Sequence, residues 1–308
     1  MGAEDMDAKP KTGRSLLGIV YFQFLILIMY TDFALLLYSL ATFNYEILAV
    51  LFAIIFLQGF AKRSEWYVHL MNDTFRIRSL FKKFEVIYDE AIPEEEVTMF
   101  GGHVHSVFAV AMACNLNFDH QRLSRAVGLC SRGLLIFPLF GLHLRLWGFQ
   151  AVEPSNLKKL LRAKKSVALL PGGFEEATLT TPNEFRVFIK SRKGFVKYGL
   201  ENGYTIRPIL FFGEHKAYWT FDYLIKLRLL INKLKFPAVW YFSPTAGTFL
   251  PTTMEVTTVV GRGVSIEGVE GKPTKEQVDE VHRKYVEEME RLYSKYKEHN
   301  GGTPMAIY

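Results

Sequence analysis

A long apolar run near the start of this chain constrains its fold more than any other feature. From Leu16 to Phe60 the sequence is almost wholly apolar, with a short polar break near its middle. A membrane-spanning helix needs about 20 apolar residues. Residues 16–40 reach this length despite Gln23 and Asp32, whereas residues 47–60 form a shorter stretch. We therefore expect a hydrophobic hairpin whose first leg spans a membrane and whose second leg either spans or re-enters it.

Positive charges flank this hairpin and are missing between its legs. Lys9, Lys11 and Arg14 precede it, and Lys62 and Arg63 follow it. Because Lys and Arg mark cytosolic segments, both ends are expected in the cytosol. A pair of buried core helices is the alternative, but soluble helices are normally amphipathic and this run is apolar all round. A cleaved signal peptide is disfavoured because the run is too long.

Composition bounds the class of protein. The 308 residues suffice for one sizeable core or a core with an appendage, and 49% hydrophobic residues exclude general disorder. The net charge of +6 suits the phosphates of nucleic acid, of a cofactor or of a membrane, so it does not choose among them. The only cysteines, Cys114 and Cys130, form no CxxC pair. A disulfide framework or a structural zinc site is therefore not expected.

The pattern changes after about residue 84. Short β-like runs at 97–100, 166–170, 205–211 and 256–260 alternate with helical stretches. This alternation predicts an α/β fold with a largely parallel sheet flanked by helices, and such sheets carry their sites at the carboxyl ends of strands. We divide the chain into a polar N-terminus (1–15), the hairpin (16–61) and an α/β domain (62–308).

A long surface helix is predicted near the C-terminal end. It opens with a capping box formed by Thr274 and Gln277 and stops at Gly301. Its inner stripe is expected to contain Val278, Val281, Tyr285, Met289, Leu292 and Tyr296.

Two histidines follow one predicted strand, in the sequence FGGHVHS. A histidine at a strand end can act as a general base, since its pKa lies near neutrality. It also needs an orienting group, usually a carboxylate. Glu175 and Glu176, in LLPGGFEEA, come from another strand end. The candidate general bases are therefore His103 and His105, and the candidate orienting groups are Glu175 and Glu176.

A pair of glycines lies just before the two glutamates. Gly172 and Gly173 would allow close approach of the backbone to a substrate and offer N–H groups to an oxyanion.

A metal site is the alternative use of the histidines. Two histidines at positions i and i+2 could begin such a site, with His120, His143 or Cys114 as further ligands. No recognised ligand spacing completes that set, so the general base is preferred.

A basic segment, EFRVFIKSRKGFVKYGL, comes next. Arg186, Lys190, Lys193 and Lys197 recur at spacings that predict one cationic stripe on a helix, with Arg192 beside it. Such a stripe suits the phosphates of coenzyme A or of lipid headgroups, and its alternative is a solvated face. Nucleic acid is disfavoured because the aromatic residues lie in apolar runs. A second cluster is expected to be a solvated helix end: Lys158, Lys159, Arg162, Lys164 and Lys165.

The order of these motifs resembles the acyl-CoA:diacylglycerol acyltransferase type 2 family, which includes monoacylglycerol and wax-alcohol acyltransferases. The resemblance covers residues from about 15 to 300, and its most specific part is 192–214, RKGFVKYGLENGYTIRPILFFGE. The family's PGG-x-x-E pattern places its glutamate on Glu176. Its HPHG motif falls on residues 103–106, where Val104 and Ser106 replace the proline and glycine.

The resemblance also implies roles for these residues. In the wider glycerolipid acyltransferase pattern, HxxxxD, His105 aligns with the base and the aspartate position falls on Val110, so Glu176 becomes the expected orienter. His103 is expected to support the site. The resemblance implies acyl transfer from acyl-CoA to diacylglycerol, giving triacylglycerol, with acyl-CoA as a substrate and no cofactor or metal. Residues 134–149 are expected to line an acyl tunnel or to be ordinary core.

The resemblance implies an enzyme of the endoplasmic reticulum membrane whose catalytic domain faces the cytosol and which also reaches lipid droplets. It also implies a homodimer, as in other members of the family. Other acceptors stay open: monoacylglycerol, a fatty alcohol, a sterol or a lysophospholipid. A non-catalytic membrane scaffold of the same fold is the alternative from another class, because the HPHG motif is altered here.

Overall fold

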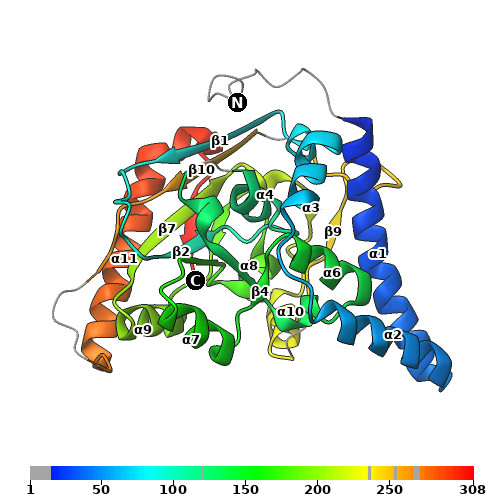
Figure 1. Ribbon diagram of the computed structural model, residues 1–308. Helices are drawn as coiled ribbons and strands as arrows, with labels where there is room; N and C mark the ends of the chain where they lie inside the picture. The colour runs from blue at the N-terminus through cyan, green and yellow to red at the C-terminus, as the bar shows by residue number, and fades with distance from the viewer. Residues whose placement is uncertain (1–14, 119–120, 235–236, 253–254, 266–270) are drawn as a thin grey trace.

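The computed structural model describes residues 15–118, 121–234, 237–252, 255–265 and 271–308, and a seven-stranded sheet lies at its centre (Figure 1). In spatial order the strands are β1 (Lys83–Tyr88), β10 (Glu255–Val260), β7 (Thr205–Phe212), β2 (Thr98–His103), β5 (Val167–Leu169), β3 (Val127–Cys130) and β4 (Gln150–Ala151). Neighbouring strands are parallel except that β10 runs antiparallel to β7. The prediction of an α/β fold with a largely parallel sheet is confirmed.

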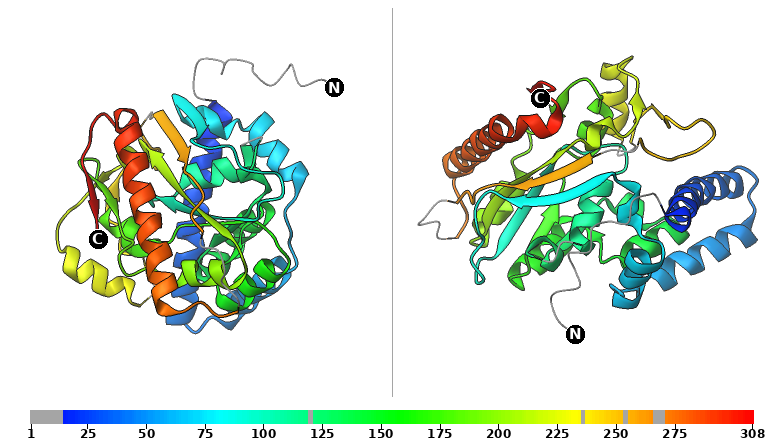
Figure 2. Two further views of the ribbon diagram at one scale, coloured as in Figure 1. Left: turned by 90° about the vertical axis from the view of Figure 1, so that its left-hand side faces the viewer. Right: turned by 90° about the horizontal axis from the view of Figure 1, so that it is seen from above.

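Helices cover both faces of this sheet (Figure 2). One face carries α7 (Pro154–Arg162), α9 (Gly194–Glu201) and α11 (Lys275–Tyr296), and the other carries α1 (Leu16–Ala41), α3 (Glu65–His69), α4 (Val110–Phe118) and α6 (Pro138–Leu146). Along β7, Ile209 and Phe211 pack toward α4, whereas Leu210 and Phe212 pack toward α11. This alternation follows from the two-residue period of a strand.

The remaining elements lie around this framework. They are the helices α2 (Tyr45–Gln58), α5 (Arg132–Leu135), α8 (Gly173–Leu179) and α10 (Ile225–Asn232), and two small sheets. One small sheet pairs β6 (Phe185–Val187) with β11 (Met305–Ile307) in parallel, and the other pairs β8 (Trp219–Thr220) with β9 (Tyr241–Phe242).

The apolar N-terminal helix α1 is attached to the domain through its few polar residues. Asp32 Oδ2 accepts hydrogen bonds from the backbone N–H groups of Leu139 and Phe140, at 3.0 and 3.1 Å. These N–H groups lie in the first turn of α6, which has no side-chain cap of its own. Gln23 Oε1 accepts from the backbone N–H of Phe249 at 2.7 Å. Polar residues that interrupt the apolar run are therefore docking contacts.

The second leg of the hairpin is also attached to the domain by hydrogen bonds from a polar side chain. Gln58, at the end of α2, donates from Nε2 to the carbonyl oxygens of Leu135 and Phe137 at 3.1 and 3.2 Å. The stretch 134–149 contains the end of α5, the whole of α6 and the turn after it. Both legs of the hairpin are hydrogen-bonded to this stretch. Whether it also lines an acyl tunnel stays a prediction.

Most of the hairpin surface is nevertheless exposed. In α1 a narrow stripe that includes Phe22 and Ile26 enters the core, while Leu17, Phe24 and Leu27 are more than half exposed. Within the described residues, α1 is the one helix long and apolar enough to cross a membrane, and α2 is shorter. This pattern suggests membrane association and differs from that of a buried core helix.

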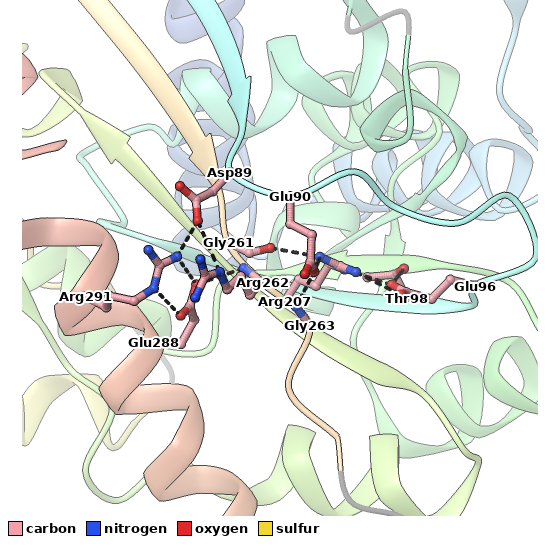
Figure 3. Close-up of polar contacts among 10 residues, drawn as sticks. All are labelled: Asp89, Glu90, Glu96, Thr98, Arg207, Gly261, Arg262, Gly263, Glu288 and Arg291. Carbon is pink, nitrogen blue, oxygen red and sulfur yellow. Dashed lines mark hydrogen bonds and ion pairs between the residues drawn. The ribbon is translucent and has the colours of Figure 1, made fainter. Parts of the chain in front are cut away.

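An ion-pair network fixes α11 against the sheet (Figure 3). Asp89, directly after β1, contacts the guanidinium groups of Arg291 and Arg262 and the ammonium of Lys295. Arg291 also pairs with Glu288 at 2.7 Å. The predicted capping box at the start of α11 is present, and its predicted inner stripe is buried except for the half-buried Tyr296.

A neighbouring ion cluster joins three strand ends. Arg207 of β7, almost fully buried, donates to Glu96 at 2.8 Å and to Glu90 at 3.0 Å. Glu96 in turn accepts from the hydroxyl of Thr98 in β2 at 2.8 Å. Both networks lie at the end of the sheet opposite the carboxyl ends of β2, β5 and β7, away from the loops that follow those three strands.

Asp89 gives a test of the first network. Burial alone would raise its pKa, but hydrogen bonds from Lys295, Tyr296 and Arg291 outweigh burial and lower it. We expect Asp89→Asn to reduce the free energy of unfolding by about 2 kcal/mol, because the buried carboxylate is the shared ionic partner of Arg291, Arg262 and Lys295. Because the folded-state pKa is lowered, this contribution is present above pH 4 and is lost as pH falls further.

The measurement is thermal unfolding of both proteins between pH 3 and pH 8. Glu287→Gln, which removes an exposed pair with Arg283 on the same helix, is the control and should change stability by less than about 1 kcal/mol. Equal stability of Asp89→Asn and wild type at pH 7 would contradict the structural role.

Candidate active site

Two adjacent strand ends bring the sequence-predicted residues together. Strands β2 and β5 are parallel neighbours, with Gly101 opposite Leu169. The chain leaves β2 through His103 and His105, and leaves β5 through a Pro-Gly-Gly turn into α8. Since both carboxyl ends lie at one edge of the sheet, Glu176 in the first turns of α8 meets the histidine loop.

The carboxylate of Glu176 is the centre of this site. Its side chain is fully buried and accepts from His103 Nδ1 at 2.9 Å, from the backbone N–H of His105 at 2.7 Å and from the backbone N–H of Phe188 at 2.9 Å. All these partners can serve as N–H donors, which is the environment that an ionised carboxylate requires. The position of the histidine loop therefore depends on Glu176.

His103 is fully buried between two partners. Its Nδ1 contacts Glu176, and its Nε2 lies 3.0 Å from the hydroxyl of Tyr285 on α11. The Tyr285 hydroxyl also lies 3.0 Å from the carbonyl oxygen of Gly101, so Glu176, His103, Tyr285 and Gly101 form one buried chain of hydrogen-bonded groups. Burial, followed by the charge of Glu176, raises the pKa of Tyr285 well above 10, so the hydroxyl keeps its proton. His103 thus has no ring nitrogen left for a substrate.

His105 has a different environment, because its ring is only partly buried. Nδ1 lies 2.7 Å from the carbonyl oxygen of Ser106, which can only accept, so Nδ1 carries the hydrogen. In the neutral ring the lone pair then lies on Nε2, for which the described residues provide no hydrogen-bond partner. Burial lowers the pKa of His105, and the Ser106 carbonyl and the Glu176 charge offset this only in part. The ring is neutral near pH 7 and can accept a proton.

The orienting contact differs from the sequence prediction. We expected Glu176 to hydrogen-bond the ring of His105, but it bonds the ring of His103 and the main chain of His105. The Ser106 carbonyl orients the His105 ring instead. The Ser106 contact could not be predicted, because residue types do not reveal which main-chain carbonyl accepts a hydrogen bond. Tyr285 was predicted only as a member of the apolar inner stripe of α11.

The two departures from the HPHG motif fit this geometry. Val104 is fully buried in the core that contains Leu210 and Tyr285. The Ser106 hydroxyl is buried and donates to the carbonyl oxygen of Glu214 at 3.0 Å, beyond the end of β7. Both replacements therefore hold the histidine loop in place.

The glycines make room for the carboxylate. A Cβ on Gly172 would lie 2.2 Å from Glu176 Oε2, and Gly173 has a positive φ of 57°. The N–H of Gly173 already donates to the carbonyl oxygen of Leu170 at 3.1 Å. The oxyanion role of this turn stays a prediction.

The C-terminal strand supports Glu176 from the other side. Strand β11 pairs with β6, and the carbonyl oxygen of Tyr308 accepts from the N–H groups of Ile189 and Lys190, at 2.9 and 2.8 Å. These residues directly follow Phe188, whose N–H contacts Glu176. The residues missed by sequence reasoning are thus main-chain groups of the segment 188–190 and the tail that holds them.

The predicted helical stripe of basic residues is wrong. Arg186 lies in strand β6, and residues 188–193 form a loop before α9, because β11 captures this segment as a strand partner. Most of these cations have carboxylate partners: Arg186 pairs with Glu184 and Asp222, Arg192 with Glu175, Lys193 with Asp279 and Lys197 with Glu201. Lys190 is exposed. Binding of coenzyme A phosphates by this set stays a prediction.

The metal alternative gains no support. Within the described residues, no group of three or more His, Cys, Asp or Glu side chains could hold a metal ion. His143 contacts the hydroxyls of Tyr21 and Tyr67 at 2.7 and 2.8 Å, and burial lowers its pKa to about 3. Cys114 is buried in α4, and His120 lies outside the described residues.

Comparison with known proteins adds an independent finding. Residues 36–306 match the sequence profile of a family described as diacylglycerol acyltransferase. The chain is 26% identical to human 2-acylglycerol O-acyltransferase 3, with 78% of this chain and 75% of that protein covered. It is 26% identical to diacylglycerol O-acyltransferase 2 of Danio rerio, with 65% and 60% covered.

A third relative is diacylglycerol O-acyltransferase 1 of Eremothecium gossypii, 31% identical, with 65% of this chain and 47% of that protein covered. The chain thus spans less than two thirds of the second and third of these relatives. No solved structure matches the chain significantly.

The central role of Glu176 can be tested with Glu176→Gln. Glutamine has one acceptor oxygen, so its amide group would face an N–H donor inside the core. We expect a loss of about 1–3 kcal/mol in the free energy of unfolding, measured by thermal unfolding. Glu175→Gln, on the same helix with a partly exposed partner, is the matched control and should lose less than about 1 kcal/mol. If the two variants unfolded at one temperature, Glu176 would not organise the loop.

Proposed function

This chain belongs to the diacylglycerol acyltransferase family, and from that premise we propose that it transfers a fatty acyl group from acyl-CoA to the hydroxyl of diacylglycerol, giving triacylglycerol. The observation that carries this proposal is the hydrogen bond from His105 Nδ1 to the Ser106 carbonyl, which leaves Nε2 as a free base. The names of the relatives, which are O-acyltransferases acting on glycerolipids, support the class of reaction.

The proposed reaction is a direct transfer. His105 Nε2 takes the proton of the acceptor hydroxyl, and the oxygen attacks the thioester carbonyl. As the new C–O bond forms, the C–S bond breaks and coenzyme A leaves as a thiolate, which the His105 imidazolium can protonate. The products are the ester and coenzyme A, so atoms and charge balance without a cofactor or metal.

His103 and Glu176 act as positioning residues in this scheme. Glu176 fixes the backbone of His105, and its negative charge stabilises the imidazolium that forms on proton transfer. N–H groups of the Gly172-Gly173 turn are the proposed oxyanion donors. Lys190 and its neighbours Arg186, Arg192, Lys193 and Lys197 are the proposed contacts for coenzyme A phosphates, after exchange of their present carboxylate partners.

We place the enzyme on a membrane, with α1 in the lipid. Its length of 26 residues and its exposed leucines support this placement. The endoplasmic reticulum, a cytosolic catalytic domain, lipid droplets and a homodimer are carried over as proposals from the family resemblance. A lipid-bound enzyme meets an acceptor such as diacylglycerol where that acceptor is dissolved.

The acceptor and the base can be tested in one experiment. Membranes containing the protein receive labelled oleoyl-CoA and either diacylglycerol, monoacylglycerol, fatty alcohol, sterol or lysophosphatidate. We expect label in triacylglycerol and a loss of at least about 100-fold in rate for His105→Ala, which removes the general base. His69→Ala, an exposed histidine on α3, should keep the wild-type rate.

If label entered only the product formed from monoacylglycerol, then monoacylglycerol would be the acceptor, as the name of the human relative suggests. Activity of His105→Ala within a few-fold of wild type would remove the base assignment. Acylation of none of the acceptors by the wild type would favour the scaffold.

The pH dependence follows from the same base. His105 must be neutral to accept a proton, and its pKa is lowered below 6.5. The acid limb of the transfer rate should therefore have its midpoint below pH 6.5, with a flat rate from pH 7 to 8. Initial rates at saturating acyl-CoA from pH 4.5 to 8 give this profile. A midpoint above pH 7 would contradict a base that is neutral at pH 7.

A further inference from the structure

A second apolar surface lies in the segment between β7 and β10. Helix α10 exposes Leu227 and Leu230, which are three residues apart and therefore share one face. Leu224 and Leu234, just outside the helix, extend this row, and Leu234 is 80% exposed. Single exposed leucines are normal on a protein, but a contiguous row indicates a surface that meets another apolar phase.

The β8–β9 pair continues this row with aromatic side chains. Trp219, Tyr223, Trp240 and Phe242 are all exposed. We name the α10 surface by its members: Trp219, Tyr223, Leu224, Leu227, Leu230, Leu234, Trp240 and Phe242.

The α10 surface is continuous with α1. An open groove of about 630 Å³ is lined by Tyr223, Trp240 and Phe242 on one side and by Tyr30 of α1 on the other. The hydroxyl of Tyr30 lies 2.7 Å from that of Tyr241, which fixes the two elements together. Any lipid that covers the exposed side of α1 therefore reaches the edge of the α10 surface.

Charges around the α10 surface favour a lipid headgroup layer. Lys226 and Lys233 are exposed on α10 and just beyond its end. Asp222 is the only acidic residue between 219 and 242, and Arg186 neutralises it at 2.7 Å. Exposed leucines together with exposed Trp, Tyr and Lys side chains are the composition expected of an interfacial helix. Anionic headgroups would attract the lysines.

The α10 surface is firmly attached to the candidate active site. Arg228 of α10 is fully buried and donates to the carbonyl oxygens of Ala238 and of Thr178, at 2.8 and 3.0 Å. Thr178 belongs to α8, the helix that carries Glu176.

A second path runs through two threonines. Thr220 of β8 donates from Oγ1 to the carbonyl oxygen of Thr180 at 2.7 Å, and Thr180 Oγ1 donates to the carbonyl oxygen of His105 at 2.8 Å. Two hydrogen bonds thus connect the α10 surface to the loop of the proposed base.

We propose that the α10 surface is a second membrane-contact site, which lies in the interfacial layer of the bilayer beside α1 and holds the His105 loop at a fixed depth. The proposal rests on the membrane association proposed for α1 and goes beyond it. Its consequence is that the hydroxyl of a lipid acceptor, which also lies in the interfacial layer, meets His105 without leaving the bilayer.

The test uses the full chain in nanodiscs of phosphatidylcholine and phosphatidylserine. Single cysteines carrying the fluorophore NBD are introduced by Leu230→Cys on the α10 surface, Leu27→Cys on α1 and Glu290→Cys on the exposed side of α11. Wild type taken through the same labelling measures the background from Cys114 and Cys130. Phosphatidylcholine with a doxyl group either near the headgroup or deep in the acyl chain serves as the quencher, so that labels at both the interface and the bilayer centre are reported.

We expect doxyl lipid to quench NBD at positions 230 and 27 several-fold more than at position 290. Quenching at 27 with none at 230 would overturn this proposal and leave the association of α1 intact. Quenching at neither position would remove the membrane association itself. NBD at 230 that is shielded from aqueous iodide but not quenched by doxyl lipid would indicate a protein partner, which also overturns the proposal. Leu227→Cys repeats the test should Leu230→Cys fold poorly.

Discussion

A buried negative charge organises this protein. Glu176 is removed from water, and such a carboxylate is tolerated only where donors satisfy it. Its donors come from two separate parts of the chain, the histidine loop after β2 and the segment after β6, and His103 in turn contacts Tyr285 of helix α11. The candidate active site is thus assembled around one buried carboxylate, and the pairing of β6 with β11 supports the segment that supplies the Phe188 donor.

The membrane hairpin follows a comparable rule. Helix α1 is apolar enough for lipid, yet Gln23 and Asp32 would be costly there. Both residues instead hydrogen-bond the domain, and Asp32 supplies the cap that α6 lacks. The same helix therefore has a lipid-compatible side and a side that docks on the domain.

The sequence was most informative where periodicity or a motif reports a local property. The four predicted strands correspond to β2, β5, β7 and β10, and the capping box and inner stripe of α11 are present, because these patterns depend on neighbouring residues alone. The family membership inferred from the motifs is confirmed by the matched family profile.

Long-range pairing was not predictable. Residues 185–197 have the spacing of a helical stripe, but β11, more than a hundred residues later, converts their first part into a strand. The pairing of Glu176 with His103, rather than with the His105 ring, depends on main-chain groups of Ser106 and Phe188 that no side-chain pattern encodes.

The order of strands in the sheet has a consequence for how the chain is made. Among the described residues, strand β1 lies at the sheet edge and pairs only with β10, which is synthesised about 170 residues later. The α1–α2 hairpin can enter a membrane while β1 still has an open edge, and open edges pair with whatever strand they meet. The charged residues at the two ends of β1, which are Lys82, Lys83 and Asp89, therefore also disfavour association of the nascent chain with another strand before β10 is made.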